Sequence, residues 1–120
     1  MEHRILGATG LSVSALSLGA SPFGGIFGAV GFDGCKRCLD TALGLGINLV
    51  DRSPHYGLTK AETMLGRTSG RTARLVHSGD QSRALWPQSS RFRFSASRVK
   101  RSVDESLACV GMEYEHHPVP

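Results

Sequence analysis

The spacing of apolar positions predicts an antiparallel start to the chain. Residues 4–19 alternate loosely between apolar and polar side chains on either side of a turn at Ala8-Thr9-Gly10. This alternation predicts a hairpin that leads into a short strand ending near Leu18-Gly19. The glycine-rich residues 24–31 have no interior polar pattern and match neither phosphate-loop motif, so we expect a loop there.

A helical spacing replaces the alternation from Asp33 onward. Apolar side chains then recur at intervals of three and four, which places them on one helical face: Cys35, Cys38, Leu39, Ala42 and Leu43. Gly44 and Gly46 supply the stop signal that such a helix needs.

A second strand and a second helix follow. Residues 47–50 are a short apolar run that predicts a strand, and Asp51 ends it. Thr59 and Glu62 have the spacing of a capping box, which predicts a helix running to about Leu65. The succession strand, helix, strand, helix is typical of an α/β fold with parallel strands.

The rest of the chain is less regular. Residues 75–91 have no regular pattern, although Leu75-Val76 has the composition of a strand. A last helix is predicted from Ser95 to Gly111, because one apolar stripe has helical spacing: Val99, Val103, Leu107 and Val110. Residues 115–120 form a tail without a usable pattern.

Length, composition and charge narrow the class of protein. The 120 residues, 40% of them hydrophobic, are typical of one small globular domain. No apolar run reaches the roughly 18 residues of a membrane span, and no signal-peptide pattern is present, so we expect a cytoplasmic chain without a membrane partner.

Residues 67–101 hold nine Lys or Arg and one acid. Such a cluster can bind nucleic-acid phosphates, but no known binding module is present, so a solvated basic surface is favoured and no nucleic-acid partner is expected.

The three cysteines raise the question of a metal or redox site. Their odd number argues against a disulfide scaffold. Cys35 and Cys38 have the spacing of a zinc pair, which His116 and His117 could complete. Both cysteines are predicted on the apolar helical face, where cysteine behaves as a small hydrophobic residue, so we expect no metal.

Asp51 and Tyr56 are the most informative pair of polar residues. Groups just beyond the carboxyl end of a parallel strand face the ligand site, and Tyr56 lies on a turn that can fold back toward Asp51. A phenol can give a proton to a developing alkoxide if a nearby cation lowers its pKa from about 10. The alternative is that Asp51 caps the turn and Tyr56 packs on the surface, and spacing alone favours this second interpretation.

Several segments, taken in order, resemble the aldo-keto reductases, in particular the L-galactose dehydrogenase-like branch. They comprise residues 4–22, 46–57, 61–66 and 94–107, so the resemblance covers most of the chain. It implies an α/β fold, namely the N-terminal hairpin and first three or so β/α units of a (β/α)8 TIM barrel. Residues 1–120 would then form one incomplete NAD(P)-dependent oxidoreductase domain without a metal, acting on a sugar or aldehyde.

The resemblance also implies roles for individual residues. Tyr56 corresponds to the general acid/base of the family, and Asp51 to the aspartate that orients a lysine near the nicotinamide ribose. Gly19, Ala20 and Ser21 correspond to residues that line the nicotinamide end of the NAD(P) site, together with Asp51.

Two segments depart from the family pattern. Residues 77–86 lack the family's lysine, and residues 116–120 lack its strand-ending histidine motif. We hypothesise that both are translated in a displaced reading frame; ordinary divergence is the alternative. Without the lysine we expect little reductase activity from this chain alone. The alternative functions are a non-catalytic fragment or pseudogene product and, less favoured, a small basic nucleic-acid-binding module.

Overall fold

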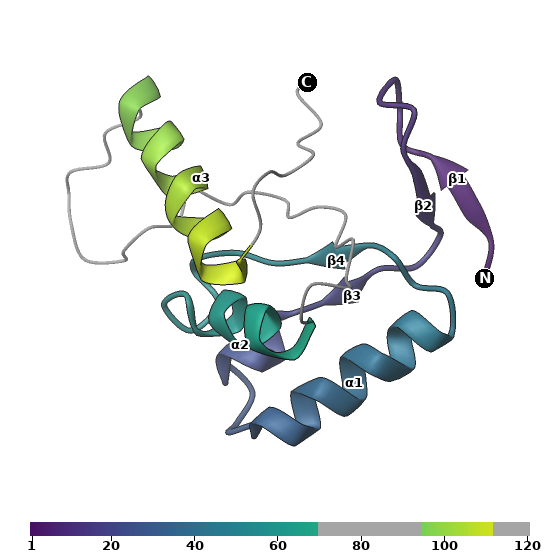
Figure 1. The fold of residues 1–120 in the computed structure, drawn as a ribbon, viewed down its shortest axis with the longest axis horizontal. Helices are drawn as coiled ribbons and strands as arrows, with labels where there is room; N and C mark the ends of the chain where they lie inside the picture. Colours follow the sequence, from purple (N-terminus) through teal and green to yellow (C-terminus); the bar gives the residue numbers. More distant parts are fainter. Residues whose placement is uncertain (70–94, 112–120) are drawn as a thin grey trace.

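The chain begins with the predicted hairpin. A computed structural model describes residues 1–69 and 95–111 (Figure 1). Strands β1 (His3–Ile5) and β2 (Ser12–Ser14) pair antiparallel, with His3 opposite Ser14. The Leu6 amide donates to the Leu11 carbonyl at 2.9 Å and so closes the predicted turn.

Two short parallel strands form the centre of the molecule, as predicted, but the second one is Val50–Asp51 and not the predicted 47–50. Strand β3 (Leu18–Gly19) pairs with β4 (Val50–Asp51), and Gly19 lies opposite Asp51 in the register. A 3-10 turn, η1 (Ser21–Gly24), leads from β3 into the predicted loop. Helix α1 (Phe32–Gly44) makes the crossover that two parallel strands require.

Asn48, which lies just before β4, is hydrogen-bonded to strand β2 of the hairpin. The Asn48 side-chain oxygen accepts a hydrogen bond from the Ser14 backbone amide at 2.7 Å. The Asn48 backbone amide donates to Ser14 Oγ at 3.1 Å. Its side-chain nitrogen donates to the Ser12 carbonyl at 3.0 Å. These bonds satisfy backbone groups at the edge of a two-stranded ladder and connect residues 34 to 36 positions apart.

The core lies between the parallel strands and the helices. Its buried members are Ala20, Phe23, Cys35, Leu39, Val50, Ala61 and Leu65. Helix α1 contributes Cys35, Leu39 and Ala42, spaced by four and three residues. The prediction that Cys38 shares this face is wrong, because Cys38 is exposed. Cys38 and Leu43 lie on the flanks of the stripe, outside the contact with the strands.

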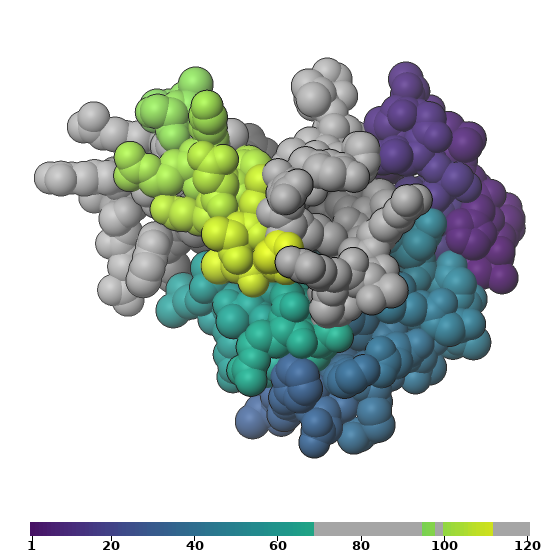
Figure 2. Space-filling view, in the orientation of Figure 1, coloured from purple at the N-terminus to yellow at the C-terminus, as the bar shows by residue number. Residues whose placement is uncertain are grey.

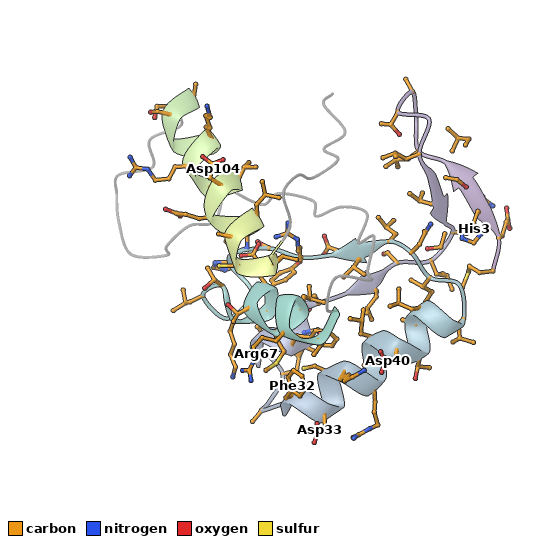
Figure 3. The ribbon with its side chains drawn as sticks, in the orientation of Figure 1. His3, Phe32, Asp33, Asp40, Arg67 and Asp104 are labelled. Carbon is orange, nitrogen blue, oxygen red and sulfur yellow. The ribbon has the colours of Figure 1, made fainter. Side chains whose placement is uncertain are left out.

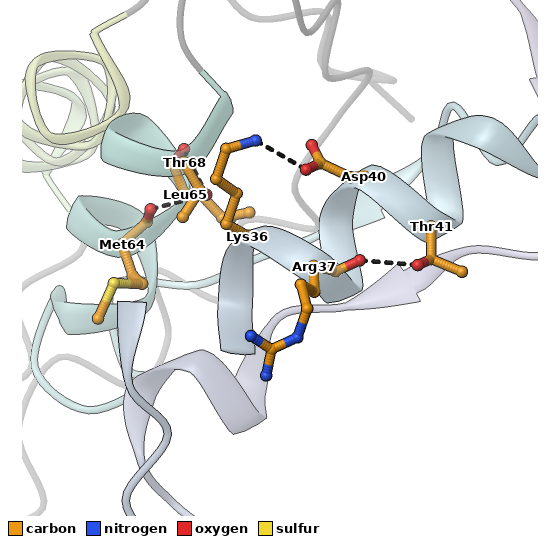
Figure 4. A network of polar contacts seen from close by, with 7 residues as sticks. All are labelled: Lys36, Arg37, Asp40, Thr41, Met64, Leu65 and Thr68. Carbon is orange, nitrogen blue, oxygen red and sulfur yellow. Dashed lines mark hydrogen bonds and ion pairs between the residues drawn. The ribbon is translucent and has the colours of Figure 1, made fainter. Parts of the chain in front are cut away.

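Helix α2 (Lys60–Ser69) begins within one residue of its predicted start. The predicted capping box is wrong. Thr59 has a left-handed φ of 68°, whereas an N-cap residue is normally extended, and the Glu62 side chain is buried against Arg52. At the other end of α2, Thr68 Oγ1 donates to the carbonyls of Met64 and Leu65 (Figure 4).

Helices α1 and α2 pack together along one side of the strand pair in Figure 1. At the edge of this contact, the Arg67 guanidinium lies 5.2 Å from the centre of the Phe32 ring (Figure 3). Such a cation–π contact contributes roughly 0.5–1 kcal/mol at an exposed site. The outer surface of α1 carries an exposed ion pair, in which Lys36 Nζ lies 2.7 Å from Asp40 Oδ2 (Figure 4).

Helix α3 (Ala96–Val110) confirms the predicted last helix, and Gly111 ends it with a φ of 73°. It packs on α2, as the contact between their surfaces in Figure 2 shows. Gly66 makes the close approach possible, because a Cβ there would lie 2.6 Å from the Cys109 carbonyl oxygen. The irregular segment 75–91 and the tail 115–120, with the reading-frame hypothesis, lie outside the described residues. Within the described ranges, no helix has the length and apolar character needed to span a membrane.

Candidate active site

Asp51 and Tyr56 meet at the carboxyl end of the parallel strands. Asp51 is the last residue of β4, and the Tyr56 hydroxyl donates a hydrogen bond to Asp51 Oδ2 at 2.9 Å. Both side chains are partly buried. The predicted proximity of these two side chains is therefore confirmed, while their catalytic roles stay predictions.

The turn after β4 brings Tyr56 back toward the strand. The Tyr56 amide donates to the Ser53 carbonyl at 3.0 Å, and the His55 amide donates to Ser53 Oγ at 3.1 Å. Ser53 is fully buried, so its hydroxyl serves the turn and not a ligand. His55 is exposed on the outside of the same turn.

The turn is fixed from its other side by two glycines in backbone contact. A Cβ on Gly57 would lie 2.2 Å from the Gly24 carbonyl oxygen, and a Cβ on Gly24 would lie 2.5 Å from the Tyr56 carbonyl oxygen. No other residue type fits at either position without a shift of the backbone. The end of η1 and the Tyr56 turn are thus interlocked.

The surroundings of Tyr56 favour its protonated form. Burial raises the pKa of the phenol above its ordinary value, and the hydrogen bond to Asp51 and the Asp51 charge raise it further. The direction is opposite to the one that a neighbouring cation would produce. At neutral pH the Tyr56 phenol therefore keeps its proton.

The three small residues predicted at the cofactor end differ in accessibility. Gly19 is exposed, and a Cβ built on it would have no atom of the described residues within 4 Å. Ser21 is half-buried at the start of η1. Ala20 is fully buried and belongs to the core, and its amide donates to the Asp51 carbonyl at 2.8 Å. Gly19 therefore presents an exposed backbone opposite Asp51 in the strand register.

Arg52 and Glu62 form an ion pair that the sequence analysis missed. The Arg52 guanidinium contacts Glu62 Oε1, and both side chains are buried. A usable signal was present, because Glu62 lies between the apolar positions Ala61 and Leu65 on the inner face of α2. A charged side chain on such a face requires a buried partner.

The cysteines do not gather at a common surface. Cys35 is buried and Cys38 is exposed. Burial raises the pKa of the Cys35 thiol, and the charge of a Cys38 thiolate would raise it further. In the part of the chain that the structure describes, no group of three His, Cys, Asp or Glu could hold a metal ion, and His116 and His117 lie outside that part.

Similarity to known proteins agrees with this geometry. The chain is 44% identical over 116 residues to an L-galactose dehydrogenase from Arabidopsis thaliana, an alignment that covers 95% of this chain. An aldo-keto reductase of known structure from Pseudomonas aeruginosa is 34% identical, superposes with a TM-score of 0.77 and covers 95% of this chain. The chain resembles the N-terminal portion of an aldo-keto reductase. No protein-family model matches it.

The similarity covers part of each aldo-keto reductase relative. The chain spans 36% of the L-galactose dehydrogenase and 44% of the Pseudomonas aeruginosa protein. A pyridoxal 4-dehydrogenase from Microbacterium luteolum is 40% identical over 65 residues, which are 54% of this chain and 19% of that protein. The fold is accordingly a partial (β/α)8 barrel, with its hairpin and first β/α units and without closure among the described strands.

Proposed function

We propose that this chain carries the proton-transfer pair of an NAD(P)-dependent oxidoreductase of the aldo-keto reductase family. The observation that carries the proposal is the 2.9 Å hydrogen bond from the Tyr56 hydroxyl to Asp51, at the carboxyl end of a parallel strand. The substrate is a carbonyl compound or alcohol, either a sugar, as the name L-galactose dehydrogenase indicates, or an aldehyde.

The chemistry assigned to Tyr56 follows from its protonation. A substrate carbonyl oxygen gains negative charge as its carbon is reduced, and the Tyr56 hydroxyl donates the proton that neutralises it. In the reverse direction the phenolate accepts the proton of an alcohol. In the free chain the Tyr56 hydroxyl hydrogen is donated to Asp51 Oδ2, which holds the phenol at the strand end. The hydrogen must turn from Asp51 to the substrate oxygen before it is transferred. A positioned general acid of this kind contributes about 10²–10⁴-fold to the rate.

Gly19 and Ser21 are the residues that we propose beside the nicotinamide. The exposure of Gly19 and its position opposite Asp51 in the strand register support this assignment. The buried Ala20 contributes its amide to strand pairing instead. When bound, the nicotinamide supplies or accepts the hydride.

We further propose that the 120-residue chain by itself has little reductase activity. The pKa of Tyr56 is raised, whereas efficient proton exchange at neutral pH requires a lower pKa. The sequence segment that would supply the family's lysine, residues 77–86, contains none. Hydride transfer by the purified chain well above that of a Tyr56→Phe control would overturn this proposal.

A chimeric enzyme tests the assigned chemistry separately from the activity of the chain. Residues 1–69 would replace the matching segment of the Arabidopsis thaliana L-galactose dehydrogenase, and NAD(P)H absorbance would follow the oxidation of L-galactose. We expect turnover, and a loss of about 10²-fold or more in kcat in the chimera with Tyr56→Phe. A folded chimera in which Tyr56→Phe leaves kcat unchanged would refute the role of Tyr56.

A further inference from the structure

The ion pair between Arg52 and Glu62 is buried, unlike the other ion pairs among the described residues. Its side chains are 4% and 0% exposed, whereas the partners in the Lys36–Asp40 pair are 49% and 55% exposed. The second carboxylate oxygen of Glu62 is also buried and has no hydrogen-bond partner among the described residues. Two desolvated charges with one oxygen left unsatisfied are a poor source of stability, so a different role has to be considered.

The pair connects the two ends of the Tyr56 turn. Arg52 directly follows Asp51, the last residue of β4. Glu62 directly follows Ala61, whose amide donates to the Tyr56 carbonyl at 3.2 Å. The ion pair therefore connects Arg52, next to Asp51, with Glu62, next to Ala61. Ala61 is the residue whose amide binds the Tyr56 carbonyl.

The turn between them is strained. Gly57, Leu58 and Thr59 have consecutive left-handed φ values of 67°, 56° and 68°. Leucine and β-branched threonine rarely adopt this region, and two such residues in succession persist only when their surroundings hold them. Leu58 is largely exposed and provides little packing. The turn is held by the backbone contact between Gly24 and Gly57, by the Thr59 amide, which donates to the Pro54 carbonyl at 2.8 Å, and by the contacts at its two ends.

We propose that Arg52 and Glu62 form a positioning pair that holds the strained turn closed and thereby keeps the Tyr56 hydroxyl against Asp51. The catalytic meaning of this role rests on the proposed function, but the positioning itself does not. Loss of the pair releases the left-handed turn, and the contact between Tyr56 and Asp51 opens with it.

Titration of Tyr56 in the full chain tests the proposal without any need for turnover. The chain has two tyrosines, so all variants carry Tyr114→Phe and the near-ultraviolet absorbance of the phenolate then reports Tyr56 alone. The main variant is R52M/E62Q, which removes both charges of the pair together and keeps the net charge unchanged. E62Q is the second variant. D51N removes the hydrogen-bond acceptor's charge directly, and K36M/D40N is the matched control at an exposed pair.

We expect the Tyr56 pKa to fall in R52M/E62Q and E62Q, toward the value in D51N, and to stay at the wild-type value in K36M/D40N. Amide hydrogen exchange at Ala61 should accelerate by about tenfold or more in R52M/E62Q, relative to amides in β1 and β2. The Tyr56 pKa reports the geometry of the folded chain. The comparison with amides in β1 and β2 separates local opening of the turn from a general loss of stability, which would accelerate exchange at all of them.

Two results would overturn the proposal. One is a wild-type Tyr56 pKa and unchanged Ala61 exchange in R52M/E62Q. The other is unfolding of both R52M/E62Q and E62Q under conditions in which D51N stays folded, since the pair would then support the whole fold and not the turn. If the chimera is inactive but the Tyr56 pKa shifts as expected, the proposed function is wrong and the positioning role of the pair still holds.

Discussion

Replacing Gly57 with alanine should destabilise the chain strongly, because the new Cβ meets two separate obstacles. Gly57 has a φ of 67°, which is unfavourable for alanine by about 1–2 kcal/mol. The added Cβ would also lie 2.2 Å from the Gly24 carbonyl oxygen and 2.8 Å from Gly24 Cα. Both neighbours are backbone atoms, so relief requires the turn to move.

The magnitude follows from the two contributions. Overpacking that shifts the backbone costs about 1–3 kcal/mol, so Gly57→Ala should lower the free energy of unfolding by about 2–5 kcal/mol. Gly10→Ala isolates the conformational part, because Gly10 has a φ of 73° and open space around its Cβ position. Gly24→Ala isolates the steric part, because its Cβ would lie 2.5 Å from the Tyr56 carbonyl oxygen and its φ is not left-handed.

Urea denaturation followed by far-ultraviolet circular dichroism measures all three variants. We expect the loss in unfolding free energy to rank Gly57→Ala largest, with Gly10→Ala at about 1–2 kcal/mol. Equal losses in Gly57→Ala and Gly10→Ala would refute the reasoning, because the close contact between η1 and the Tyr56 turn would then carry no energetic weight.

Three further predictions follow from burial and charge. Leu65→Ala should lower the unfolding free energy by about 2–5 kcal/mol, because Leu65 is fully buried in the core, as urea denaturation would measure. Cys38 should be alkylated by iodoacetamide before Cys35, as peptide mass spectrometry would detect, since Cys38 is exposed whereas burial excludes the reagent from Cys35 and raises its thiol pKa. The raised Tyr56 pKa should contribute stability that is full below the ordinary tyrosine pKa of 10.0 and is lost as pH rises through the folded value. The unfolding free energy of Tyr56→Phe should therefore decline less steeply above that pH than that of the unsubstituted chain.

Each of these has a simple control. Leu16→Ala should change the unfolding free energy by less than about 0.5 kcal/mol, because Leu16 is 62% exposed. Modification of Cys35 ahead of Cys38 in the folded chain would contradict the assigned burial. Parallel pH profiles for Tyr56→Phe and the unsubstituted chain would show that the phenol has the same pKa in the folded and unfolded states.

The sequence allowed prediction of those features that local spacing determines. Alternation around Gly10 and the helical stripes of α1 and α3 predicted elements that the structure contains. The contact between Asp51 and Tyr56 was one of two interpretations. Spacing alone favoured the other one, and the family resemblance favoured the contact.

Tertiary contacts decided the features that were missed. Glu62 has the spacing of a capping residue, but the buried Arg52 attracts its carboxylate into the core. Cys38 has helical spacing from Cys35, yet the strand pair covers only a narrow stripe of α1 and leaves Cys38 outside it. The spacing of residues along the sequence does not show where a buried partner such as Arg52 lies, nor how much of a helix surface is covered by neighbouring elements.

The parallel pairing of β3 and β4 has a consequence for the order of folding. Leu18 and Val50 must meet across a loop of about 32 residues, and closing a flexible loop of that length costs about 3 kcal/mol of chain entropy. The ladder itself offers amide bonds from Leu18 and Ala20, which contribute only about 0.5–1.5 kcal/mol each. The strands therefore cannot associate ahead of the crossover helix. Asp51 reaches its final place only in the cooperative step that docks α1, so mutations that slow this docking should delay the appearance of the Tyr56 contact by the same factor.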